Sequence, residues 1–312
     1  TMQTFWDVEE VQTRAIQRLA RFIKDESVLP CLLMFTESIT SAMKNHIDSL
    51  KLQVDGCSLL LEILSQALEQ DVVVALDENV ASSLLVTVRT HSENEELLSL
   101  VCTLLMMISA SEVAAENLRK VGAIPDLLSI LRNFLHNEQI CHSCCGVLWS
   151  LAVSEDGVDE VLLKSAVPVI SAALQEHLQN GTVTESACSA LWALSLQGCL
   201  TEDEYEPTTA LLLGALRMGP ERPLLVKNAC LALASLLRLS EIAALRFITD
   251  SKGSGINLIQ DAYHLHFDDP EVVENICVLM NEMVQYEDVV LDMLSLKMEE
   301  LLSEIKIRFS SS

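Results

Sequence analysis

The densest group of residues that could bind a metal is the segment Cys141-His142-Ser143-Cys144-Cys145. Zinc prefers thiolate and imidazole ligands, and Cys141 and Cys144 would share one face of a helix because they are three residues apart. A structural zinc site needs four ligands, usually from two such pairs, and the sequence contains no second CxxC pair. We therefore expect buried thiols here, with no metal and no cofactor.

The other residues capable of acid–base or nucleophilic chemistry are not spaced for it. The sequence contains no GxSxG, HExxH, GxGxxG or Walker pattern. His264 and His266 flank Leu265, so on a helix their side chains would point in different directions. The paired acids are typical of helix surfaces and caps: Glu9-Glu10, Glu95-Glu96 and Glu299-Glu300. We expect no catalytic site, and an enzyme is the least favoured class of function.

Charge restricts the partners of this chain, which has 45 Asp and Glu against 20 Lys and Arg and a formal net charge of −25. That charge repels phosphate backbones and anionic lipid. We therefore expect a protein partner with a basic segment or surface, and neither nucleic acid nor membrane. The longest uncharged apolar stretch, residues 97–110, is too short to cross a bilayer.

The start of the chain carries no secretory signal, so we expect a cytoplasmic protein, with the nucleus as the alternative. The chain opens Thr1-Met2 and not with an initiator Met. This predicts an excerpt of a longer protein, with further domains in the full-length chain.

The composition indicates the elements that position these residues. Apolar residues make up 50% of the 312 residues and aromatic residues only 4%, with 10 Gly and 7 Pro. Turn formers and aromatic residues are scarce, which argues against a sandwich or barrel and favours close-packed helices.

An internal repeat dominates the sequence. Residues 144–151 (CCGVLWSL) align with residues 187–194 (ACSALWAL) at an offset of 43, and the same offset places Ala123-Ile124-Pro125 on Ala166-Val167-Pro168. Further copies begin at residues 15, 56, 101, 229 and 276, so successive spacings are 41, 45, 43, 43, 42 and 47. Repeats of roughly 40–47 residues are typical of helical armadillo and HEAT units.

Residues 113–152 form the clearest unit, and they resemble the armadillo repeat. A short first helix over 117–121 ends at Gly122, which suits a sharp bend because it tolerates positive φ. Pro125 then lies in the first turn of a second helix, and residues 140–152 form a long third helix. The next unit has Ser165 in place of the Gly. The resemblance implies an all-α fold, a right-handed α-solenoid of about six to seven armadillo-like repeats.

The repeat boundaries predict four segments: a partial first repeat over 1–26, an armadillo-like array over 27–286, a capping helix over 287–309 and a tail over 310–312. Residues 5–24 are predicted to form a third helix with no first or second helix before it.

Six of the ten cysteines occupy one repeat position, namely Cys57, Cys102, Cys145, Cys188, Cys230 and Cys277. A thiol is a small apolar filler, so we expect these six side chains to be buried and reduced.

Trp149 and Trp192 also share a repeat position. They could be core rings in successive layers, which we favour, or aromatic walls of a binding groove. The resemblance implies that third helices line the concave side of the solenoid. In known family members these helices present Asn residues that bind a peptide backbone. The matching positions here carry no Asn: Arg21, Glu62, Met107, Ser150, Ala193, Ser235 and Glu282.

We therefore predict a non-catalytic protein-interaction scaffold or regulatory region of a larger intracellular protein, with its partner on the concave face. The candidate partner-binding residues are Glu62, Trp149, Ser150, Trp192, Ser235 and Glu282, with Glu155, Asp156, Glu202 and Asp203 as flanking acids. The alternative is a structural module that assembles into a homodimer through its terminal repeats.

Overall fold

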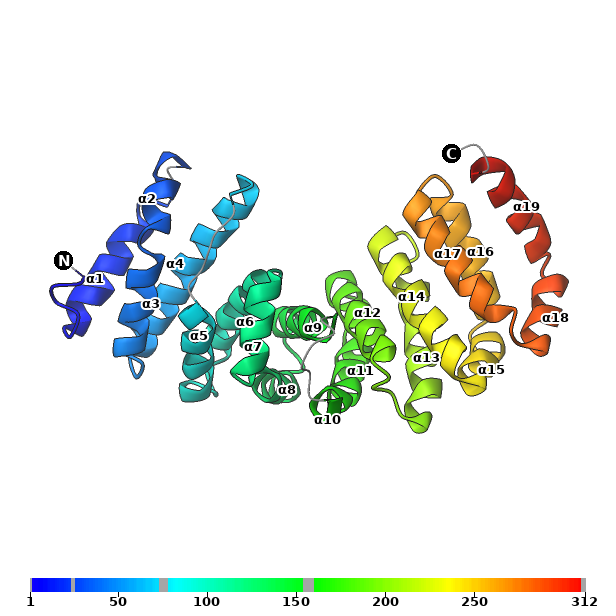
Figure 1. The fold of residues 1–312 in the computed structure, drawn as a ribbon, viewed down its shortest axis with the longest axis horizontal. Coiled ribbons are helices and arrows are strands. Elements are labelled where there is room, and N and C mark those ends of the chain that lie inside the picture. The colour runs from blue at the N-terminus through cyan, green and yellow to red at the C-terminus, as the bar shows by residue number, and fades with distance from the viewer. Residues whose placement is uncertain (1, 24–25, 73–77, 154–159, 310–312) are drawn as a thin grey trace. The chain divides into compact units, whose positions relative to one another are not determined.

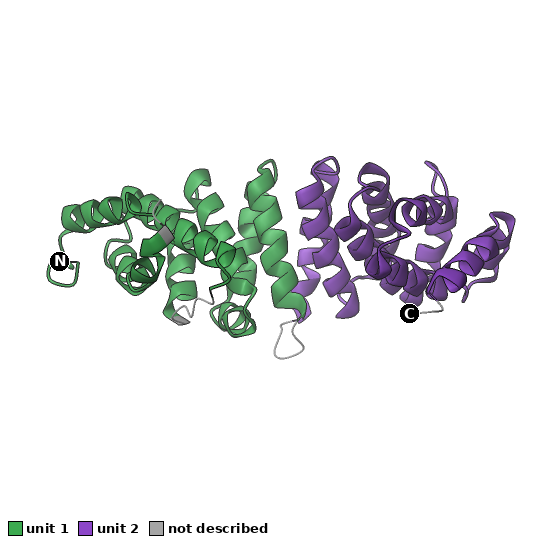
Figure 2. Ribbon diagram, turned by 90° about the horizontal axis from the view of Figure 1, so that it is seen from above, with its two compact units in different colours: residues 1–154 green, residues 155–312 purple. Residues whose placement is uncertain are grey.

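The computed structural model describes residues 2–23, 26–72, 78–153 and 160–309, and every regular element within these ranges is a helix (Figure 1). The helices form two compact units, residues 1–154 and residues 155–312 (Figure 2).

The first unit contains α1 (Glu9–Ala20), the 3-10 helix η1 (Glu26–Val28), α2 (Leu29–Leu33), α3 (Thr36–Asn45), α4 (Leu50–Glu69), α5 (Glu78–Thr90), α6 (Glu95–Ser109), α7 (Glu112–Lys120), α8 (Ala123–Asn133) and α9 (Glu138–Val153). The second unit contains α10 (Glu160–Lys164), α11 (Ala166–Glu176), α12 (Gly181–Leu196), α13 (Glu202–Met218), α14 (Pro223–Leu239), α15 (Glu241–Thr249), α16 (Gly255–His266), α17 (Pro270–Met283), α18 (Glu287–Ser295) and α19 (Met298–Phe309).

Six of the recurring segments lie within long helices, which we call the third helices: α4, α6, α9, α12, α14 and α17. The weak seventh copy begins in α1. In the first unit α6 packs between α4 and α9, and in the second unit α14 packs between α12 and α17. The predicted all-α solenoid of repeats is confirmed in each unit, because each helix packs mainly on its near neighbours in sequence.

A polar side chain caps the start of most third helices. In each case the side-chain oxygen accepts a hydrogen bond from a backbone N–H in the first turn, at Ser49, Asn94, Asn137, Asn180 and Asp269. Capping satisfies backbone donors that have no partner inside the helix. Successive caps are separated by the same number of residues as the cysteines, so the helix start belongs to the repeat. The exception is α14, where Arg222 precedes Pro223 and makes no side-chain cap.

The predicted bend between the first and second helices is confirmed at Gly122, which has φ 75° and separates α7 from α8. Pro125 lies in the first turn of α8, as expected. In the following unit Ser165 has φ −70°, so the chain passes from α10 into α11 without a left-handed residue. Only Gly adopts a positive φ such as that of residue 122 at no steric cost. The φ of Ser165 is negative, so a residue with a β-carbon is tolerated there.

The predicted single capping helix over 287–309 is wrong, because this segment forms two helices. Lys297 has φ 58° and lies between α18 and α19. Apolar residues continue across the break at helical spacing, so the sequence pattern does not reveal it. The predicted N-terminal helix is also shorter than expected, since α1 begins at Glu9. Gln12 Nε2 donates hydrogen bonds to the carbonyl oxygens of Met2 (2.9 Å) and Phe5 (2.6 Å), which holds the preceding residues in turns.

A search of the described helices for a segment long and apolar enough to cross a membrane finds none.

Candidate functional site

The two matched tryptophans lie on third helices, and neither is buried. Trp149 on α9 keeps 39% of its surface exposed, and Trp192 on α12 is half-buried. The favoured interpretation of both as core rings is therefore wrong. The residues that directly precede the two Trp residues, Leu148 and Leu191, lie in the core at 1% exposure each. Each Trp is one residue further along and is rotated by about 100° toward the outside of the stack.

Other predicted partner-binding residues differ in burial although they share a repeat position. Glu62 on α4 is exposed, whereas Ser235 on α14 is only 4% exposed and belongs to the core. Ser235 is correctly assigned to a third helix but is wrong as a binding residue. It lies on the side of α14 that packs against the other helices of its unit.

Two of the remaining candidates are already engaged within the chain. The Ser150 hydroxyl donates to the Gly146 carbonyl oxygen at 3.2 Å, as helical serines commonly do. The Glu282 side chain is 13% exposed, and its Oε1 lies 3.3 Å from Arg238 Nε on α14.

The flanking acids fall into two groups. Glu202 and Asp203 are exposed in the first turn of α13, where their negative charge interacts favourably with the positive end of the helix dipole. Glu155 and Asp156 lie outside the described residues.

Polar pairs join adjacent third helices of the second unit. Asn228 Nδ2 on α14 donates to Ser189 Oγ on α12 at 2.6 Å. Arg222 Nε donates to Glu185 Oε1 on α12 at 2.8 Å. On the other side of α14, Lys227 Nζ lies 2.5 Å from Glu271 Oε2 on α17.

The first unit has a smaller bridge of the same kind between α6 and α9. Gln139 Nε2 donates to Thr103 Oγ1 at 3.1 Å and to Ser143 Oγ at 3.2 Å. Sequence reasoning missed all of these bridges. A signal for some of them exists, because Lys227 and Glu271 have opposite charges and lie one repeat apart.

The comparison with known families agrees with this stack of helices. A family model described as LRRK2 ARM repeat matches residues 167–311, which run from α11 to the end of α19. This match supports an armadillo-like helical repeat family. The match includes α18 and α19, which lie beyond residue 286, where the sequence pattern alone ended the repeat array.

The cysteine layer of the armadillo-like stack is buried, with one exception. Five of the six equivalent cysteines have no exposed surface, and none of the six forms a disulfide. Cys277 on α17 is only half-buried, so the prediction of burial is wrong for this residue. Burial raises the pKa of the Cys57 and Cys188 thiols, and raises that of Cys230 to about 12. These thiols are protonated at neutral pH and are poor nucleophiles.

The segment 141–145 lies in α9, where Cys141, Cys144 and Cys145 are fully buried. The Sγ atoms of Cys144 and Cys102 are 3.6 Å apart, between adjacent third helices of the armadillo-like stack. The hydrogen bond to Cys102, followed by burial, raises the pKa of the Cys144 thiol well above its usual value. Within the described part of the chain, no three His, Cys, Asp or Glu side chains are grouped as metal ligands would be.

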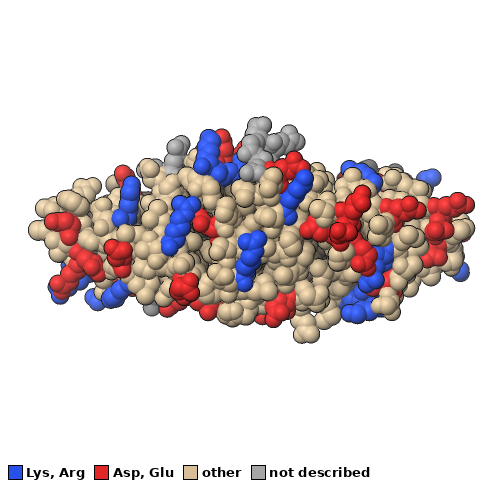
Figure 3. Space-filling view, turned by 90° about the horizontal axis from the view of Figure 1, so that it is seen from below, with Lys and Arg blue, Asp and Glu red and all other residues tan. Residues whose placement is uncertain are grey.

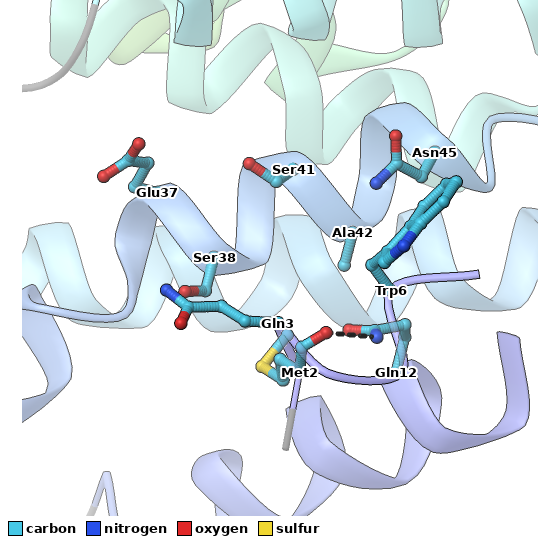
Figure 4. A pocket seen from close by; sticks show the side chains of 9 residues that line it. All are labelled: Met2, Gln3, Trp6, Gln12, Glu37, Ser38, Ser41, Ala42 and Asn45. Atoms are coloured by element: carbon cyan, nitrogen blue, oxygen red, sulfur yellow. Dashed lines mark hydrogen bonds between the residues drawn. The ribbon is translucent and has the colours of Figure 1, made fainter. Parts of the chain in front are cut away.

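A cavity of about 240 Å³ lies between the segment before α1 and the helix α3 (Figure 4). Trp6 and Gln12 form one wall, and Glu37, Ser41 and Asn45 of α3 form the other. Glu37 is its one lining carboxylate, and no His or Cys accompanies it. The cavity therefore lacks the pair of groups that acid–base or nucleophilic catalysis needs.

On the molecular face shown in Figure 3, Lys and Arg atoms form separate islands among acidic and uncharged atoms. This arrangement differs from the continuous basic stripe that binds a phosphate backbone.

Proposed function

We propose that this armadillo-like chain is a non-catalytic protein-interaction module that binds a protein partner along its third helices. The observation that carries the proposal is the exposure of Trp149, at 39%, on the third helix α9. A large rigid ring on a helix surface is an effective binding contact because it buries much area at low entropy cost. Val153 and Leu196, one turn beyond the two Trp residues, are also exposed, which supports an apolar contact strip on each of the two helices.

The favoured partner is a basic segment. The net charge of −25 makes approach of a basic partner favourable, and the exposed Glu202 and Asp203 would raise its association rate. We further propose that the module is a scaffold or regulatory region of a larger protein in the cytoplasm or nucleus. Its free thiols fit a reducing compartment.

The proposal is tested by selecting peptides from a phage-displayed random library on the immobilised chain and measuring their affinities by fluorescence anisotropy. Trp149→Ala and Trp192→Ala should weaken the selected peptides by about tenfold or more. Trp6→Ala is the matched control, because Trp6 is 59% exposed but does not lie on a third helix. Selection of acidic peptides, or equal loss in all three variants, would contradict the proposal.

A second candidate function is self-assembly through the terminal repeats. It is favoured by exposed apolar side chains on and beside the first and last helices, including Trp6, Phe22, Leu291, Leu294 and Ile307. Light scattering over a concentration series distinguishes the two functions, since assembly increases the mean mass with concentration whereas a monomeric module keeps it constant.

A further inference from the structure

A groove of about 650 Å³ lies on the second unit, away from the third helices. It runs between α11 and α13, and the loop after α15 closes one end. Its walls are apolar and mostly small, made by Pro168 and Ala172 of α11, Leu178 after it, and Ala210, Leu211 and Gly214 of α13. A β-carbon on Gly214 would lie 3.7 Å from Leu178, which is an ordinary contact, so the Gly is not required by a tight fit at this wall of the groove. Small residues let a helix approach closely.

The two ends of the groove have opposite charge. Glu204 and Glu206 line it near the start of α13, and the exposed Glu202 and Asp203 lie in the same turn. Arg217, in the last turn of α13, and Lys252 line the other end. Glu204 and Arg217 are separated by thirteen residues of helix, or roughly 20 Å at 1.5 Å per residue. This length suits a helix of three to four turns.

Some of this charge is already neutralised within the chain. Arg246 lies 3.1 Å from Glu206 and 3.1 Å from Asp250, and Asp250 also pairs with Arg217. Lys252, by contrast, is exposed and has no ion pair within the described part of the chain. Lys252 at one end and Glu202 and Asp203 at the other therefore keep charge available for a partner.

Two buried polar atoms of residues that line the groove have no hydrogen-bond partner within the described ranges. These atoms are Ser171 Oγ and Arg246 Nε, whereas the buried Asp250 Oδ2 is paired with Arg217. Buried polar atoms without partners are rare in folded proteins, because each one is destabilising. Both atoms are closed to solvent, so a docked partner would contact the exposed charges at the two ends of the groove instead.

We propose that this groove docks a short amphipathic helix of a protein partner, lying parallel to α13. The positive end of the partner's helix dipole, with Lys or Arg in its first turn, faces the acidic residues at 202–206. Its negative end, with Glu or Asp in its last turn, faces Arg217 and Lys252. Aliphatic side chains between the ends lie against Ala172, Ala210 and Gly214. This surface is separate from the third helices, so it can be occupied while the third helices hold another partner.

The proposal is tested with two stapled helical peptides of about four turns, which corresponds to the groove length at 5.4 Å per turn. Both carry the same Leu stripe and the same staple. The forward probe has Lys in its first turn and Glu in its last, and the reversed probe has these charges exchanged. Fluorescence anisotropy with the whole chain measures both affinities, and the forward probe should bind about tenfold tighter because only it matches the charge at both ends.

Three substitutions locate the binding site. Lys252→Glu should remove most of the preference for the forward probe, whereas Lys306→Glu, which makes the same charge change on the exposed face of α19, should leave it unchanged. Gly214→Leu should fill the groove and abolish binding of the forward probe, while Gly214→Ala should reduce it only slightly. Melting temperatures identify any variant that fails to fold, and Lys252→Glu keeps the test decisive because its side chain is exposed.

The proposal is overturned if neither probe binds, or if both probes bind equally. It is also overturned if Lys252→Glu and Gly214→Leu leave binding unchanged, or if an unstapled extended peptide of the same sequence binds as well as the helix. Loss of forward-probe binding in Trp192→Ala would assign the probe to the third helices and would likewise overturn it. Failure here leaves the proposed function of the third helices intact, because that function is tested with different variants.

Discussion

A β-carbon on Gly255 would lie 2.6 Å from Cε2 and Cζ of the Phe247 ring. Both residues are buried, and Phe247 has no exposed surface. Gly255 is the first residue of α16, and Phe247 lies near the end of α15. The bare backbone at residue 255 therefore lets the first and second helices of this repeat pack around an aromatic ring.

We expect Gly255→Ala to lower the free energy of unfolding by about 1–3 kcal/mol, because the ring has no space into which to move. Gly214→Ala is the matched control in the same unit. Its new methyl group makes an ordinary contact, and replacing Gly inside a helix should stabilise the chain by up to about 1 kcal/mol. Urea denaturation of both variants checks the prediction, and a Gly255→Ala variant as stable as the parent would show that Phe247 packs elsewhere.

The buried thiol of Cys230 should make stability depend on alkaline pH. Burial raises its pKa from 9.0 to about 12 in the folded chain, so the unfolded chain releases the proton first. This contribution to stability is complete below about pH 9 and is lost as the pH rises toward 12, at about 1.4 kcal/mol per pH unit. Cys230→Ala should therefore lose about 1 kcal/mol less than the parent between about pH 8 and pH 10 in urea titrations. Identical losses in the two proteins would show that the thiol is not buried.

The two repeat-matched tryptophans should contribute unequally to stability. Trp149→Ala should lower the free energy of unfolding by less than the roughly 3–5 kcal/mol expected for a core aromatic, because more than a third of the ring is already in water. Trp192→Ala should cost more than Trp149→Ala, since Trp192 is half-buried. Thermal melts followed by circular dichroism measure both changes, and a core-sized loss for Trp149 would place that ring inside the stack.

Asp250 should be the most sensitive charged residue of the second unit. Its side chain is 4% exposed and lies between Arg217 and Arg246. Asp250→Asn leaves two guanidinium groups without their shared anion, so we expect a loss of about 2–4 kcal/mol. Glu300→Gln, which removes the exposed pair with Lys297, should cost less than about 0.5 kcal/mol. Equal effects in chemical denaturation would show that the Asp250 pairs are as weak as surface pairs.

Much of the fold could be predicted from the sequence because the repeat is encoded locally. Small residues and Leu recur at helical spacing in every copy, and this stripe is enough to identify each third helix and its buried side. The bend at Gly122 could be predicted for a similar reason, because the ability to adopt a positive φ is a property of Gly itself. The caps at Asn94, Asn137 and Asn180 carry an equally local signal that follows the same spacing.

The exposure of individual side chains was decided only by the tertiary structure. Ser150 and Ser235 share a repeat position, yet one is half-buried and the other is in the core. A change of helix rotation by one residue, about 100°, turns a side chain from the core to the surface. That rotation depends on the neighbouring helices, which differ from one repeat to the next.

The groove between α11 and α13, and the pairing of Asp250 with two arginines, likewise join residues that are distant in the chain. The sequence by itself determined that this protein is a stack of helices and which stripe of each third helix is buried, because a helix pattern is short-range. Only the tertiary structure decided which tryptophan meets solvent, where the last helix breaks and which charges meet, because those depend on contacts between different repeats.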